Sequence, residues 1–207
     1  MVHKLNVSLS YVEVGRWMHE HGFDVRRRYD RREQLYDVVG QEVGHRAVLY
    51  MEFGVWQGEA TRYWSKLLRN PASRLHGFDS FEGLPEDWET GKKRAGHFST
   101  GTQAPEIDDP RVRFYKGWFN DTLPKYEMPT HEALVLNMDA DLYSSTIYAL
   151  NALSRSIVPG TYIYFDEFYD RLNELRAFNE FLAAGKMQFQ LIGATRNLVH
   201  ALFRRVS

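Results

Sequence analysis

The chain has 207 residues, of which 43% are hydrophobic and 26% charged, and its formal net charge at pH 7 is -1. This length and composition predict a single globular domain over residues 1–207, and the near-zero charge gives no global field that would recruit nucleic acid or an anionic membrane. There are no cysteines, which excludes disulfides, thiolate metal sites and a cysteine nucleophile. No run approaches the ~18 apolar residues of a membrane span, and the first residues lack the apolar core of a signal peptide. We therefore expect a cytoplasmic protein that binds neither nucleic acid nor membrane.

The first part of the chain is polar. Residues 11–44 have a helix-like pattern, and we expect residues 1–45 to form an N-terminal helical cap. The basic run RRRYDRR, residues 26–32, lies within this part. Such a run is typical of a solvated helix face. The alternatives are contact with an acidic partner and cover over an active site.

From residue 47 onward, apolar and helix-like segments alternate. Strands are predicted at residues 47–53, 74–79, 111–117, 132–139 and 161–166. Helices are predicted at residues 59–70, 144–156 and 171–184, the second with the capping hydroxyls of Ser144, Ser145 and Thr146 at its start. Two further strands, at residues 188–194 and 197–206, predict an antiparallel pair. The order predicts an α/β, Rossmann-like fold with a seven-stranded, mostly parallel sheet, an antiparallel C-terminal edge and helices on both faces.

The loop after the first predicted strand, EFGVWQG at residues 52–58, carries two glycines. Gly54 permits a tight turn and Gly58 opens the next helix. Asp79 ends the second strand, roughly twenty residues on, where an acid binds ribose hydroxyls in nucleoside-binding sheets. The alternative is that Asp79 is an ordinary turn or cap residue. A pyrophosphate is disfavoured because the turn carries Glu52 and Glu59, so S-adenosylmethionine, with its ammonium and sulfonium, fits better.

Two aspartates, Asp139 and Asp141, follow the fourth predicted strand directly. In extended backbone such positions point to the same side, so their charges repel unless a cation lies there. The alternative is that Asp141 begins a turn and caps the next helix. The spacing alone leaves both interpretations open.

Five motifs together resemble those of a known family: EFGVWQG, FDSFEGLP (residues 78–85), GWFNDTLP (117–124), DADLYSST (139–146) and FDEF (165–168). Over about residues 50–170 the chain resembles class I S-adenosylmethionine-dependent methyltransferases, and within them the TylF/MycF-like macrocin O-methyltransferase family. The resemblance implies a magnesium ion and transfer of a methyl group to a hydroxyl of a sugar, a glycoside or a similar vicinal diol. It leaves a homo-oligomer open.

The resemblance also implies roles for particular residues. The metal-binding pattern of the family falls on Asp139, Asp166 and Glu167, with Glu167 where the family usually has a second aspartate. The expected cofactor-binding residues are Glu52, Phe53, Gly54, Gly58, Asp79, Ser80, Phe81 and Trp118. For Trp118, core packing is the alternative.

A catalytic base is expected near the acceptor. His97 is the first candidate, because it lies within residues 80–110, which we expect to form an acceptor-side insertion, and because histidine has a suitable pKa. Asp139 is the rival base, and the alternative for His97 is an exposed loop position. Two other functions remain open: a catechol-type or phenolic O-methyltransferase, and a non-catalytic nucleoside-binding protein of the same fold.

Overall fold

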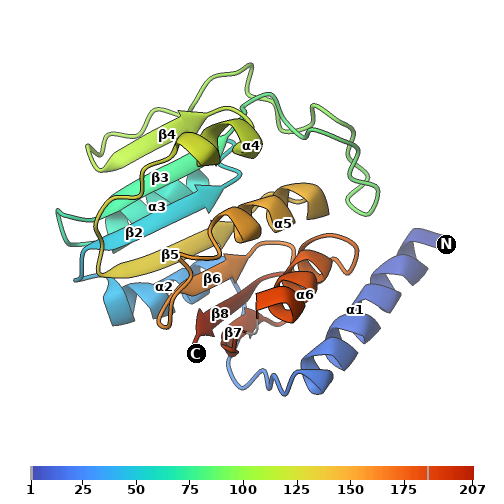
Figure 1. Ribbon diagram of the computed structural model, residues 1–207. Helices are drawn as coiled ribbons and strands as arrows, with labels where there is room; N and C mark the ends of the chain where they lie inside the picture. Colours follow the sequence, from blue (N-terminus) through green and yellow to red (C-terminus); the bar gives the residue numbers. More distant parts are fainter. Residues whose placement is uncertain (1, 186) are drawn as a thin grey trace.

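The computed structural model describes residues 2–185 and 187–207. The strands are β1 (Arg28–Tyr29), β2 (Val48–Phe53), β3 (Arg74–Asp79), β4 (Val112–Lys116), β5 (Ala133–Met138), β6 (Tyr162–Phe165), β7 (Phe189–Thr195) and β8 (Ala201–Arg205). The helices are α1 (Val2–Glu20), α2 (Arg32–Val43), α3 (Glu59–Leu67), α4 (Phe119–Thr122), the 3₁₀ turn η1 (Leu123–Lys125), α5 (Tyr143–Ala152) and α6 (Glu174–Gly185). One sheet contains all these strands, in the order β1-β7-β8-β6-β5-β2-β3-β4 (Figure 1).

The sheet is mostly parallel. Strands β4, β3, β2, β5 and β6 pair in parallel, and β8 runs antiparallel to both β6 and β7. All seven predicted strands are present, so the predicted α/β sheet with an antiparallel C-terminal edge is confirmed. The additional strand β1 pairs in parallel with β7. It is only two residues long and carries no apolar alternation, which is why the sequence pattern does not reveal it.

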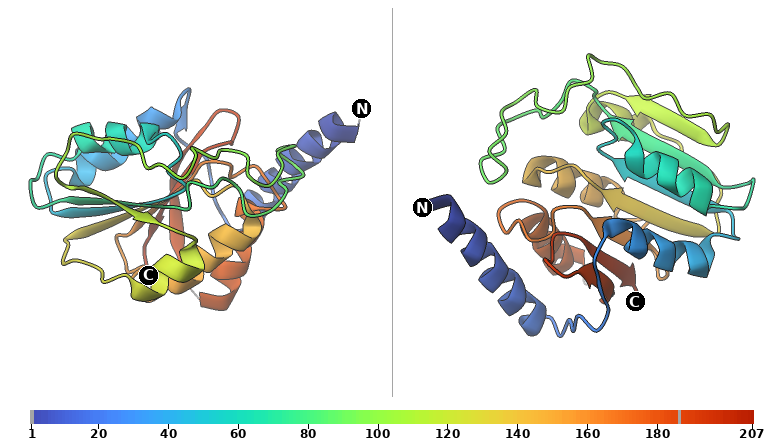
Figure 2. Two further views of the ribbon diagram at one scale, coloured as in Figure 1. Left: turned by 90° about the horizontal axis from the view of Figure 1, so that it is seen from above. Right: turned by 180° about the vertical axis from the view of Figure 1, so that it is seen from behind.

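Helices cover both faces of the sheet because the strand side chains alternate between them (Figure 2). On β2, Val48 and Tyr50 pack with α2 and α3 in one core cluster. Leu49 and Met51 face the opposite way and join the cluster that contains buried residues of α1, α5 and α6. The central strands are therefore buried on both faces, which holds their carboxyl ends in fixed positions.

The N-terminal part differs from its predicted continuous helical pattern. Gly22, at φ +68°, ends α1, and the N–H of Phe23 donates to the carbonyl of Met18 at 2.8 Å. This is a Schellman-type helix end, which requires the positive φ that glycine supplies. Most of the basic run consequently lies in a loop and in β1. Only Arg32, the first residue of α2, is helical.

The start of α5 also differs from expectation. Leu142, in an extended conformation, precedes the helix, and the three hydroxyl residues predicted as caps lie inside its first turn. The N–H of Tyr143 instead donates to Oδ1 of Asn173 at 3.0 Å. A side chain close to the start of α6 thus performs the capping that a local hydroxyl was expected to perform.

None of the helices in the described part of the chain is long and apolar enough to cross a membrane.

Trp64 of α3 tests the core between α2, α3 and the sheet. It is 1% exposed, and its ring lies 4.8 Å from that of Tyr50 and 5.3 Å from that of Tyr36, centroid to centroid. We expect Trp64→Ala to lower the free energy of unfolding by about 3–5 kcal/mol, because it removes buried apolar area and leaves a cavity. Denaturant unfolding followed by circular dichroism measures the change.

The matched control is Trp56→Ala, since Trp56 is 41% exposed. We expect it to change stability by about 1 kcal/mol or less. Equal losses for the two variants would contradict the assignment of Trp64 to the core.

Candidate active site

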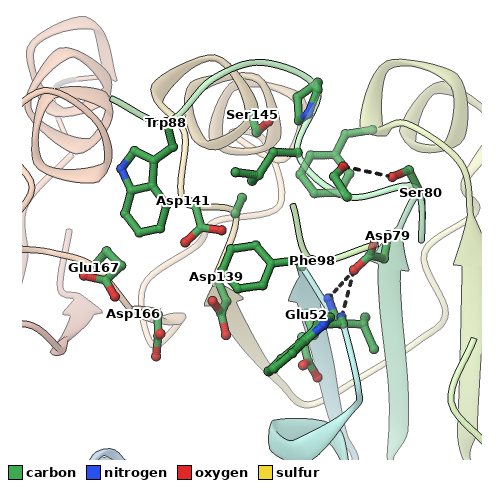
Figure 3. A pocket seen from close by; sticks show the side chains of 18 of the residues that line it. Glu52, Asp79, Ser80, Trp88, Phe98, Asp139, Asp141, Ser145, Asp166 and Glu167 are labelled. Atoms are coloured by element: carbon green, nitrogen blue, oxygen red, sulfur yellow. Dashed lines mark hydrogen bonds between the residues drawn. The ribbon is translucent and has the colours of Figure 1, made fainter. Parts of the chain in front are cut away.

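One cavity of about 800 Å³ lies at the carboxyl ends of the central strands. Its walls come from the loops after β2, β3, β5 and β6, from the start of α4 and from the long segment between β3 and β4 (Figure 3). The chain leaves β2 toward β3 on one side, while β5 pairs with β2 on the other. The cavity therefore lies at the switch in strand order, where α/β sheets bind ligands.

The glycine loop after β2 lies directly against the backbone that follows β5. Gly54 has φ +93°, and a Cβ placed on it would lie 1.8 Å from the carbonyl oxygen of Asp139. Gly58, at φ +76°, precedes α3, and a Cβ there would lie 2.8 Å from Cγ of Pro105. Both positions therefore require glycine, the first so that the β2 loop can approach the candidate acidic site.

Asp79 joins the loops after β2 and β3. Its Oδ2 accepts the N–H groups of Val55 at 2.8 Å and Trp56 at 2.9 Å, and its Oδ1 accepts the N–H of Phe81 at 2.7 Å. The carboxylate also lines the cavity. Asp79 is thus a turn-organising residue, as the alternative interpretation held. Because Asp79 also lines the cavity, its predicted binding of ribose hydroxyls stays a prediction.

The other predicted cofactor residues divide into two groups. Glu52, Gly54, Asp79, Ser80 and Trp118 line the cavity. Glu52 is 1% exposed and accepts hydrogen bonds from the hydroxyls of Tyr50 and Thr61. Burial raises the pKa of Glu52 to about 8.

The side chains of Phe53 and Phe81 are 0% and 1% exposed and do not line the cavity, and neither does Gly58. The ring of Phe53 stacks on that of Phe78, with centroids 5.2 Å apart, so it is a core residue. The apolar pattern of β2 could not distinguish Phe53 from Glu52, because residues at the end of a buried strand can face either the core or the site.

Four carboxylates line the cavity at the ends of β5 and β6: Asp139, Asp141, Asp166 and Glu167. Burial, together with the charges of Asp166 and Asp141, raises the pKa of Asp139 well above its usual range. Burial and Asp166 raise the pKa of Asp141 to about 7 and that of Glu167 to about 8. Asp141 has φ +61° and does not cap α5.

Asp166 differs from its neighbours because it has partners. Its Oδ1 accepts the Tyr164 hydroxyl at 2.8 Å and lies 3.2 Å from Nδ1 of His200 and 3.4 Å from Nη1 of Arg32. Burial alone would raise the pKa of Asp166, but His200, Arg32 and Tyr164 outweigh it and lower that pKa. No local sequence pattern marks His200 or Arg32 as a site residue, since both reach Asp166 only through the tertiary fold.

The donor set fits a hard divalent cation. Carboxylate oxygens are the ligands that such ions prefer. However, no three His, Asp or Glu side chains of residues 2–185 and 187–207 already surround one point as a closed metal site does. The residues thus fit a metal by the chemistry of their oxygen donors, while their side chains do not form a closed site in this structure.

The candidate base His97 is exposed and does not line the cavity. The next residue, Phe98, lines it instead, at φ +68°, with its ring 5.5 Å from that of Trp56, centroid to centroid. Trp88 lines the same wall, and its Nε1 donates to Asp170 at 2.9 Å. The segment between β3 and β4 thus contributes aromatic rings to the cavity, and Asp139 rather than His97 lies among the acids.

Comparisons with known proteins agree with this geometry. Residues 24–200 match the family model described as Macrocin-O-methyltransferase (TylF). A 4'-O-methyltransferase of Streptomyces olivaceus that acts on 8-demethyl-8-(2,3-dimethoxy-alpha-L-rhamnosyl)-tetracenomycin-C is 33% identical, over 57% of this chain and 52% of that protein. Demethyldecarbamoylnovobiocin O-methyltransferase of Streptomyces niveus is 32% identical, over 74% of this chain and 66% of that protein. The chain thus spans about half to two thirds of the length of these curated relatives.

The solved structure of the O-methyltransferase NovP has the same fold. It superposes with a TM-score of 0.58 at 28% identity, over 85% of this chain and 78% of that one. This confirms the class I methyltransferase fold that the resemblance implies. The family model covers most of the chain, and with this fold it shows that the chain belongs to the macrocin-O-methyltransferase (TylF) family.

Proposed function

We propose that this chain is an S-adenosylmethionine-dependent, magnesium-dependent O-methyltransferase that acts on a hydroxyl of a sugar or glycoside. The observation that carries the proposal is the single cavity in which the glycine loop, Asp79 and the acids after β5 and β6 meet. Family membership supports the reaction, and the names of the two curated relatives support a glycosylated acceptor. The cytoplasmic location and the absence of a nucleic-acid partner stay predictions.

The cofactor would lie over the carboxyl ends of β2 and β3. Asp79 has two oxygens that already accept three N–H groups, and a carboxylate has about four lone-pair positions, so it retains capacity for a ribose hydroxyl. Gly54 has no side chain to obstruct a ligand above the β2 loop. Ser80 and Trp118 line the same cavity and would flank the adenosine.

The acceptor would enter from the side of Trp88 and Phe98. We assign residues 80–110 to the acceptor side because this segment supplies these rings, which lie beside the acids in the cavity (Figure 3). Sugar rings present apolar faces that pack on aromatic side chains, so the wall suits a glycoside. A phenolic acceptor would also pack there, which keeps a catechol-type substrate as the alternative.

Methyl transfer needs an acceptor oxygen aligned with the methyl group and a group that takes its proton. When bound, S-adenosylmethionine would supply an electrophilic methyl group: the acceptor oxygen would bond to the methyl carbon as the carbon–sulfur bond breaks, and S-adenosylhomocysteine would remain. A magnesium ion held by Asp139, Asp166 and Glu167 would supply Lewis acidity that favours the alkoxide form of the acceptor. Asp139 is the proposed base, because its carboxylate lines the cavity among the acids at the end of β5. The position of His97 outside the cavity gives no support for the same role.

Asp79→Ala tests the cofactor site. We expect it to weaken binding of S-adenosylhomocysteine by about tenfold or more, because a charged hydrogen-bond acceptor is lost and the β2 loop loses its anchor. Isothermal titration calorimetry measures the affinity, and circular dichroism checks that the fold is retained. Asp108→Ala, at an exposed position outside the cavity, is the control. An affinity equal to that of the wild type would remove the ribose assignment.

Asp166→Asn tests the metal site. We expect the variant to lose metal-dependent turnover and Mn²⁺ binding measured by electron paramagnetic resonance, because an amide is a poor replacement for a charged ligand. Its affinity for S-adenosylhomocysteine should stay near that of the wild type. Asp24→Asn, at a position that is 72% exposed, controls for loss of a surface charge. Full activity and Mn²⁺ binding in Asp166→Asn would show that the acidic cluster is structural.

A further inference from the structure

The charges that line the cavity are strongly unbalanced. Seven carboxylate residues contribute to its wall, and of the described lining residues Arg32 alone is a cation. Arginine stays protonated at any relevant pH, so this charge is permanent. Arg32 is the one residue of the basic run at residues 26–32 that lines the cavity. The composition of the run did not reveal this position.

Arg32 is held by acids, yet its contacts with them are long. Nη1 lies 3.4 Å from Oδ1 of Asp166, and Nη2 lies 3.3 Å from Oε2 of Glu59. Charge-assisted bonds of this type are usually about 2.7–2.9 Å long. A guanidinium has five N–H donors, and the Arg32 side chain remains 25% exposed. Its Nε also lies 3.7 Å from Oε1 of Glu33 on α2, so three acids surround the group, and none of these contacts has the length of a strong ion pair.

The proposed cofactor carries three charges that need partners in this cavity. Its ammonium and sulfonium are cations, for which the acids are abundant. Its carboxylate is an anion that would be repelled by these same acids. The N–H groups of Val55 and Trp56, which could otherwise bind a carboxylate in the glycine loop, already donate to Asp79.

We propose that Arg32 binds the carboxylate of the methionine part of S-adenosylmethionine, so that α2 contributes a cofactor-binding residue. The inference rests on the proposed function. It explains why a cation at the first residue of α2 reaches across to the ends of β6 and α3. The planar fork of the guanidinium matches a carboxylate, which a lysine at the same position would match less well.

If the only role of Arg32 were to neutralise Asp166, binding of two related ligands would respond differently to its removal. S-adenosylhomocysteine and 5'-methylthioadenosine are both neutral overall, and the first differs in having the ammonium and carboxylate groups. If Arg32 only neutralises the acids, its removal should change the affinity for either ligand little, or strengthen binding of S-adenosylhomocysteine through its ammonium group. If it contacts the carboxylate, its removal weakens S-adenosylhomocysteine alone.

The experiment is calorimetric titration of wild type, Arg32→Met, Arg32→Lys and Arg26→Met with both ligands, without added metal. Arg26 belongs to the same basic run, is 86% exposed and does not line the cavity, so it is the matched control. We expect Arg32→Met to weaken S-adenosylhomocysteine by about tenfold to a hundredfold and to leave methylthioadenosine unchanged. Arg32→Lys should recover part of the loss, and Arg26→Met should bind both ligands as the wild type does.

Two results would overturn the inference while the proposed function stands: unchanged affinity of Arg32→Met for S-adenosylhomocysteine, or equal losses for both ligands in a folded variant. Wild-type protein that binds neither ligand would overturn both the inference and the proposed function. Thermal unfolding of each variant without ligand establishes that the fold is intact.

Discussion

The parallel pairing of β2, β5 and β6 forces carboxylates from different parts of the sequence into one small volume, and the surrounding structure accommodates that repulsion. Burial disfavours the ionised form of these groups, and the neighbouring like charges add to that effect, so the pKa values of Asp139, Asp141 and Glu167 are raised. Asp166 stays acidic because a hydroxyl, an imidazole and a guanidinium face it. An arrangement that is unfavourable in the absence of a ligand is one that a cation would stabilise.

Close backbone contact makes this charge density possible. The β2 loop can lie on the backbone of Asp139 because Gly54 has no Cβ, and Asp79 then fixes the loop through the N–H groups of Val55 and Trp56. Three residues of the cavity wall, Trp56, Phe98 and Asp141, have positive φ without being glycine. Strained backbone of this kind persists where the surrounding structure holds it, and it is concentrated at functional sites.

Different elements of the fold supply different kinds of side chain to the cavity. The sheet supplies the rigid acids, the long segment after β3 supplies aromatic walls, and α2 supplies the cation of Arg32. Loops of this kind vary among proteins of one fold while the strand ends do not move, which allows one reaction to serve many acceptors. The proposed cofactor and metal roles therefore depend on the sheet, whereas the proposed acceptor contacts depend on the rings of Trp88 and Phe98.

The sequence by itself determined the order of strands and helices, the glycine loop, and the acids at Asp139, Asp166 and Glu167. These are local features: apolar runs, turn residues, and charges that follow a strand end. Only the tertiary structure decided that Arg32 and His200 face Asp166, that Phe98 rather than His97 lines the cavity, and that Phe53 belongs to the core. The physical reason is that a side chain's direction in a loop, and its partners across the sheet, depend on packing between segments far apart in the sequence. Local pattern carries no information about that packing.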